Sequence, residues 1–106
     1  MNYKQIKKDG FFSVNGREYK LTKCNFVESR AIFDDIAILE KFGKGLSITS
    51  SQEFKKLEKN IFKHILTEDN FNIGNDYFED FPEDYIEVLT VGGMALVSPF
   101  LPKNTD

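Results

Sequence analysis

The sequence predicts a single α+β domain in which an N-terminal β-hairpin packs on a small set of helices. Three observations lead to this prediction. The chain has 106 residues, which is enough for one domain with one modest core. An Asn-Gly pair separates two short, alternating apolar segments near the N-terminus. Apolar residues then recur at helical spacing along much of the remaining sequence.

The hairpin is predicted over residues 11–21. Asn-Gly suits a type I′ turn because both of its central residues need positive φ. The resulting register pairs Val14 with Arg17 and Phe12 with Tyr19. Because strand side chains alternate between faces, the apolar members of these pairs lie on one face. An isolated hairpin is marginal in water, so this face needs a covering layer of helices.

The first helix is predicted over residues 26–42. Asn25 can cap its start, and Glu28 completes a capping-box pattern with it. Gly43 provides the stop signal. The apolar residues cover more than one face, which predicts burial on two sides or a second contact surface. They are Ile32, Phe33, Ile36, Ile38, Leu39 and Phe42.

The second helix is predicted over residues 51–67, after a loop at 44–50. Ser50 with Glu53 gives a start signal. An amphipathic stripe follows, and lysines occupy the opposite face. The stripe consists of Phe54, Leu57, Ile61, Phe62, Ile65 and Leu66.

The third helix is predicted over residues 82–98, followed by a loose tail at 103–106. Pro82 suits its first turn, and Pro99 ends it. Glycine in a helix interior costs about 1 kcal/mol relative to alanine. The adjacent glycines at 92 and 93 are therefore expected to permit a close backbone approach or to mark a bend.

Charge is unevenly distributed. Residues 1–67 carry a net charge of +5, and residues 68–106 carry −8. Such an asymmetry can steer a partner or orient self-association. Residues 88–102 carry no charge, but they are too few and too interrupted to span a membrane, and no signal peptide is visible. We therefore expect an intracellular protein, and its acidic balance does not favour nucleic-acid binding.

The residues that usually perform catalysis are scarce. His64 is the single histidine and Cys24 the single cysteine, so they cannot by themselves form a structural zinc site. No nucleophile or carboxylate can be assigned to His64 from the sequence, and no phosphate-binding glycine motif is present. We predict a protein that is not an enzyme and has no metal or cofactor.

Three stretches together resemble the tail assembly chaperones of long-tailed bacteriophages. Residues 14–21 (VNGREYKL) are similar to the opening pattern of that family. Residues 29–42, followed by glycine, resemble its first helix. Residues 78–89 (FEDFPEDYIEVL) running into 95–101 (ALVSPFL) resemble its closing pattern, although relatives are expected to have Asn-Phe near Ser98 and Pro99.

The resemblance implies a chaperone that binds the tape-measure protein and keeps it soluble in the host bacterial cytoplasm until the tail tube assembles. An amphipathic tape-measure helix would lie in an apolar groove. The groove candidates are Ile38, Phe42, Met94, Val97, Phe100 and Leu101.

A second hypothesis uses the acidic residues. The chain could be a small phage-encoded protein that inhibits a host or defence protein by presenting an acidic face to a basic pocket. That face would contain Glu79, Asp80, Glu83, Asp84 and Glu87. The opposite charges of the two halves also suit a homo-oligomer, and the sequence does not choose between a ring and a dimer.

Overall fold

The computed structural model describes residues 2–43, 50–74 and 76–102. It confirms the α+β prediction, with a three-stranded antiparallel sheet of order β1-β2-β3 packed against helices. The predicted tail at 103–106 and most of the predicted loop at 44–50 lie outside the described residues.

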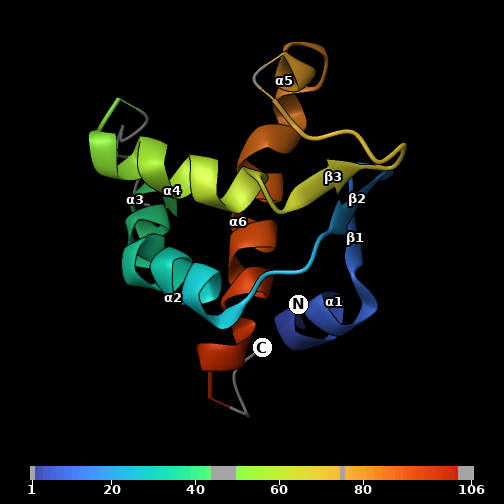
Figure 1. The fold of residues 1–106 in the computed structure, drawn as a ribbon. Coiled ribbons are helices and arrows are strands. Elements are labelled where there is room, and N and C mark those ends of the chain that lie inside the picture. The colour runs from blue at the N-terminus through green and yellow to red at the C-terminus, as the bar shows by residue number, and fades with distance from the viewer. Residues whose placement is uncertain (1, 44–49, 75, 103–106) are drawn as a thin grey trace.

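Helix α6 (Tyr85–Leu96) runs through the middle of the molecule (Figure 1). The sheet lies on one side of it, and α2 (Phe26–Asp35) and α4 (Gln52–Phe62) lie on the other. After its first turn α6 is apolar around most of its circumference, with Thr90 as the one polar residue, as expected for a helix that is packed on several sides. The largest fully buried side chains form the core between the layers: Tyr19, Phe54, Ile32, Leu57, Ile61, Ile65, Leu89 and Leu96.

The predicted hairpin is confirmed, including its register. Strands β1 (Phe11–Val14) and β2 (Arg17–Leu21) pair Val14 with Arg17 and Phe12 with Tyr19. The turn residues have positive φ, 52° and 82° in chain order, as a type I′ turn requires.

The first predicted helix is confirmed in its start but not in its continuity. Both hydrogen bonds of the capping box between Asn25 and Glu28 are present. The α-helix ends at Asp35, and the chain continues as a 3₁₀ turn, η1 (Ile36–Leu39), and a short helix, α3 (Glu40–Gly43). Two carboxylates end α2, where the negative end of the helix dipole disfavours them, and this is a physical reason for the break.

The second helix was predicted over 51–67, which is too long at its C-terminal end. Helix α4 is capped by Ser51 rather than Ser50 and ends at Phe62. Residues Ile65–Thr67 form strand β3, which pairs with β2. Ile65 and Leu66 fit the helical stripe by spacing, but β2 offers unpaired backbone groups that a strand can satisfy. Tertiary pairing therefore overrides the helical pattern here.

The third predicted helix begins later than expected. Pro82 opens a 3₁₀ turn, η2 (Pro82–Asp84), ahead of α6, and a second such turn, η3 (Ser98–Phe100), follows it. The glycine prediction is confirmed as close approach: a Cβ atom on Gly92 would lie 2.4 Å from Ile65 Cδ1. The same region holds a short helix preceding η2, α5 (Tyr77–Asp80).

The helix at the N-terminus was also not predicted from the sequence. Helix α1 (Tyr3–Asp9) begins at Asn2, whose side chain accepts the Gln5 N–H, and ends at Gly10 with φ of 84°. It contributes Tyr3 and Ile6 to the periphery of the core. Tyr3 and Ile6 are the two apolar residues of this short helix, which is otherwise polar, so the sequence pattern is weak. A helix of this length is marginal in water by itself, and α1 is therefore stabilised by packing beside α6.

Candidate protein-binding surface

Three phenylalanines form a contact at the surface that we call the aromatic cluster, in which Phe26 and Phe33 are exposed and Phe100 is partly buried against the core. Phe100 stacks on Phe33 with ring centroids 5.0 Å apart and meets Phe26 at 5.6 Å. Phe26 is 65% exposed and Phe33 is 39% exposed. Aromatic side chains that remain in water although they already contact one another are typical of interaction surfaces rather than of cores.

Local structure explains the position of this cluster. Phe26 and Phe33 are seven residues apart on α2, so they lie on one helical face, while Ile32 faces the core. Pro99, within η3, follows the end of α6 and helps to bring Phe100 back over α2. Phe33 was among the residues that were expected to extend the apolar surface of the first helix beyond one face, whereas Phe26 was not singled out from the sequence. The exposure of Phe26 could have been predicted from its position on the helix, because this large apolar residue falls outside the stripe that faces the core.

A second apolar feature lies between α1, η1 and α6. It is a hollow of about 380 Å³. Met94 lines it, together with Ile36 and Leu39. The other lining residues are Tyr3, Ala37, Glu40 and Thr90.

The structure separates the six predicted groove residues. Met94 and Phe100 belong to the hollow and to the aromatic cluster respectively. Ile38 is half-buried against the core, and Leu101 is half-buried with its carbonyl accepting the Lys4 ammonium at 2.8 Å. Val97 is fully buried and is therefore not accessible to a partner in this structure. Phe42 lies in α3, but its side chain is outside the described part of the molecule.

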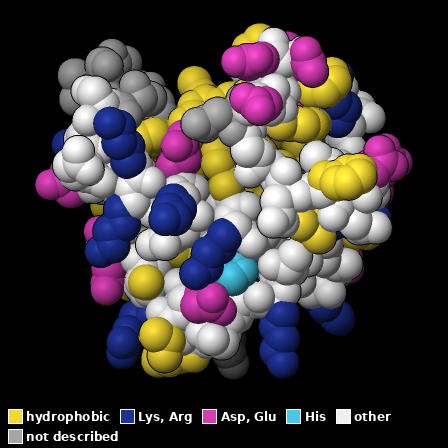
Figure 2. All heavy atoms as spheres, turned by 45° about the horizontal axis from the view of Figure 1, so that its top comes forward, with side chains coloured by type: hydrophobic (Ala, Val, Ile, Leu, Met, Phe, Trp, Pro, Cys, Tyr) yellow, Lys and Arg dark blue, Asp and Glu magenta, His cyan; other side chains and the backbone are white. Residues whose placement is uncertain are grey.

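The acidic residues are likewise divided. Glu79, Asp80 and Glu87 are exposed, and Figure 2 shows acidic side chains at the top of the molecule, in the region of α5. Glu83 is exposed and pairs with Arg17 at 2.6 Å. Asp84 is 0% exposed, so its placement on an acidic face was wrong.

Asp84 is instead the centre of a buried polar cluster. Its carboxylate accepts hydrogen bonds from Asn15 Nδ2 at 2.7 Å, from Arg17 Nε at 2.7 Å and from the Tyr19 hydroxyl. The Tyr77 hydroxyl then donates to Tyr19 at 2.8 Å, because the Tyr19 proton is engaged by Asp84. Burial raises the pKa of Asp84, but the bonds from Arg17, Asn15 and Tyr19 outweigh it and lower this pKa to about 2.

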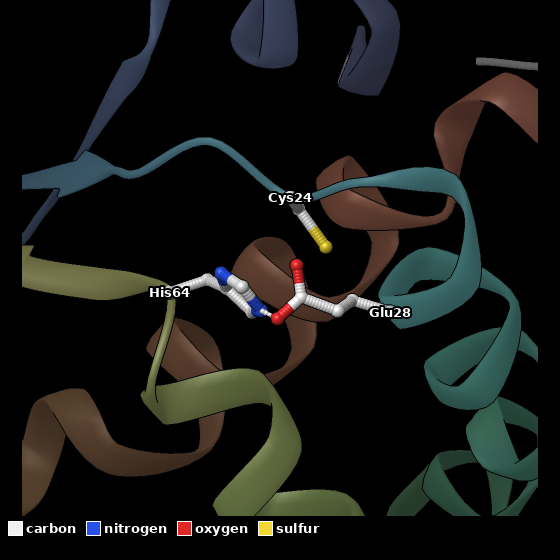
Figure 3. A group of neighbouring side chains, drawn as sticks. All are labelled: Cys24, Glu28 and His64. Atoms are coloured by element: carbon white, nitrogen blue, oxygen red, sulfur yellow. Dashed lines mark ion pairs between the residues drawn. The ribbon is translucent and has the colours of Figure 1, made fainter.

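A second polar cluster was not anticipated from the sequence. Cys24, Glu28 and His64 come together where the β2–α2 connection meets the α4–β3 junction (Figure 3). His64 Nε2 lies 3.5 Å from Glu28 Oε2. Burial lowers the pKa of His64, opposed by the Glu28 carboxylate. For Glu28, the Asn25 backbone N–H and the nearby His64 and Lys63 lower the pKa despite partial desolvation.

The surroundings of this cluster are mixed in charge. The histidine, cyan in Figure 2, is surrounded by lysine or arginine and acidic side chains, with hydrophobic side chains at the lower edge of the same face.

Within the described residues no helix combines the length and apolar character needed to cross a membrane.

Comparisons with family models, with curated proteins and with solved structures find no match to this chain. The likeness to tail assembly chaperones therefore stays a prediction from the sequence.

Proposed function

We propose that this chain is a tail assembly chaperone of a long-tailed bacteriophage, which binds the tape-measure protein and keeps it soluble in the host cytoplasm during tail assembly. The proposal unites the sequence resemblance with a surface of suitable chemistry. It describes a binding protein and not an enzyme.

The aromatic cluster is the observation that carries the proposal. A long tape-measure helix exposes apolar side chains that aggregate unless they are covered. Phe26, Phe33 and Phe100 offer large rigid rings to such a helix at low entropic cost, and Arg30 lies 5.8 Å from the Phe26 ring to provide a polar border. The hollow lined by Met94 offers a pocket for an anchoring side chain.

The test is co-expression with the long tail protein encoded beside this gene, followed by pull-down and measurement of its soluble fraction. The native chain should keep that protein soluble and should be recovered with it. Phe33→Asp should abolish both effects, because it removes the ring that stacks on Phe100 and places a charge in the apolar surface.

Phe71→Asp is the matched control. Phe71 is 71% exposed but lies on the turn beyond β3, away from α2. It should leave binding unchanged, and circular dichroism should show that both variants are folded. If the native chain neither binds the tape-measure protein nor changes its solubility, the proposal is wrong.

The exposed carboxylates of α5 support a second candidate, inhibition of a basic host or defence protein. Glu79 and Asp80 project from a four-residue helix near the sheet. A lysate pull-down in low salt should then recover a basic protein, and Glu79→Lys with Asp80→Lys should release it. This result, with Phe33→Asp having no effect, would favour the inhibitor over the chaperone.

A further inference from the structure

Three potential metal ligands meet in the cluster that contains the single cysteine and the single histidine. Cys24 comes from the segment after β2, Glu28 from the first turn of α2, and His64 from the junction between α4 and β3. One ligand atom from each side chain lies within 4.8 Å of the other two. Figure 3 shows the Cys24 sulfur and the His64 ring directed toward the Glu28 carboxylate.

The second observation is an unpaired buried nitrogen. The His64 side chain is only 6% exposed, and its Nε2 makes no hydrogen bond within the described part of the chain. Glu28 Oε2, at 3.5 Å, is within ion-pair distance of a protonated His64, as the dashed line in Figure 3 marks, but it forms no hydrogen bond with Nε2. Buried polar atoms nearly always have a hydrogen-bond partner. A buried nitrogen that lacks one and is directed at two other possible metal ligands indicates that a bound ligand is missing.

The opposite side of the ring is held in place. His64 Nδ1 lies 3.4 Å from the Thr22 hydroxyl, which leaves Nε2 as the free ring nitrogen. Histidines that bind metals usually engage their other nitrogen in this way, because the bond fixes the orientation of the ring.

The other two side chains are also positioned by neighbours. Glu28 Oε1 accepts the Asn25 backbone N–H at 3.2 Å as part of the capping box, which leaves Oε2 directed at His64. The Ser29 hydroxyl donates to Cys24 Sγ at 3.3 Å. Lys63 Nζ lies 3.4 Å from Glu28 Oε2 and is half exposed, so it can withdraw into water when a cation arrives.

An entry route adjoins the cluster. A hollow of about 140 Å³ is lined by Glu28 and His64 together with Val27, Ala31, Asn60 and Lys63. It has room for water beside the ligand atoms, which an incomplete coordination sphere needs.

We propose that Cys24, Glu28 and His64 bind a zinc ion, with water as the fourth ligand. Sulfur, nitrogen and carboxylate oxygen are all accepted by zinc in tetrahedral sites. Metal–ligand bonds of about 2.0–2.3 Å place tetrahedral ligands roughly 3.5 Å apart, so the side chains need to close by about 1 Å. Binding releases the thiol proton to solvent.

No metal was expected from the sequence, because the single cysteine and the single histidine are too few for a structural zinc site. Glu28 supplies the third ligand. It was interpreted from the sequence only as a capping-box residue. The zinc proposal does not depend on the chaperone proposal, since it concerns a different set of side chains and is tested without a protein partner.

The test is titration of the reduced, full-length chain with Zn²⁺ by calorimetry, and with Co²⁺ by absorption spectroscopy. We expect single-site binding, a rise in the thermal midpoint, and the charge-transfer band of a cobalt–thiolate bond. Cys24→Ser should abolish that band and weaken binding by at least about 10- to 100-fold.

Glu28→Gln tests the third ligand while sparing the fold, because glutamine also completes a capping box. It should weaken zinc binding by a similar factor. Glu53→Gln, in the first turn of α4, is the matched control and should leave binding unchanged. Absence of binding to the native chain, or binding by Cys24→Ser and Glu28→Gln that is as tight as that of the native chain, would overturn the proposal.

Discussion

The Asp84 cluster and the cluster of Cys24, Glu28 and His64 both join segments that are distant in the sequence, but they differ in how completely their buried atoms are paired. Both oxygens of Asp84 accept hydrogen bonds, and the charge is balanced by Arg17. His64 Nε2 has no such partner among the described residues. The Asp84 carboxylate therefore contributes to the fold through satisfied hydrogen bonds, whereas His64 Nε2 is available to bind a ligand.

The largest expected effect comes from removing the acceptor in the paired cluster. Asp84→Ala should lower the free energy of unfolding by about 3–5 kcal/mol, because Asn15, Arg17 and Tyr19 all lose their acceptor. Urea denaturation measures this loss. Glu83→Ala, which removes an exposed partner of the same arginine, should cost less than about 1 kcal/mol. Equal losses would mean that the buried cluster contributes no more than a surface ion pair.

Acid should weaken the same cluster. The pKa of Asp84 falls from its usual 3.8 to about 2 on folding, so the folded state holds this carboxyl deprotonated where the unfolded state would bind a proton. The resulting stability, about 2 kcal/mol, is present above pH 5 and is lost as the pH falls toward 2. Denaturation midpoints across this range measure the loss, and Asp84→Asn should flatten the profile. An unchanged slope in that variant would assign the acid sensitivity to other carboxylates.

Packing next to the cluster of Cys24, Glu28 and His64 can be tested at Gly92. A Cβ atom there would clash with Ile65, which is fully buried and follows His64 in the chain. Gly92→Ala should destabilise by a net of about 1–2 kcal/mol, since overpacking exceeds the gain in helix propensity. Thermal unfolding measures the change. Gly74→Ala is the control, because nothing lies within 4 Å of its added methyl group. A stable Gly92→Ala would show that the Ile65 side chain can move aside to accept the methyl group.

The smallest effect is expected at the unpaired nitrogen itself. In the presence of a chelator, His64→Asn keeps a polar group near Thr22 and removes Nε2. Because Nε2 makes no hydrogen bond, the loss of stability should be about 1 kcal/mol, arising from the small cavity. Urea denaturation again measures it. A loss as large as that of Asp84→Ala would mean that His64 is a structural residue without need of a ligand.

The features that the sequence determined are those whose signals lie within a few residues. Asn15 and Gly16 specify the hairpin turn and thereby its register, and Asn25 with Glu28 specifies the start of α2. The paired glycines of α6 left a close approach and a bend open, and the structure shows a close approach by Ile65. The exposed position of Phe33 could be inferred in part, because it falls outside the stripe that faces the core.

Tertiary structure alone decided the features that depend on distant partners. Strand β3 replaced the end of a predicted helix because β2 offered backbone hydrogen bonds, and α1 formed because α6 covers it. Asp84 became buried because Arg17, 67 positions away, could pair with it. His64 reached Glu28 only because α2 and α4 pack side by side. Local spacing carries no information about such pairings, since their free energy comes from groups that only the folded chain brings within hydrogen-bonding distance.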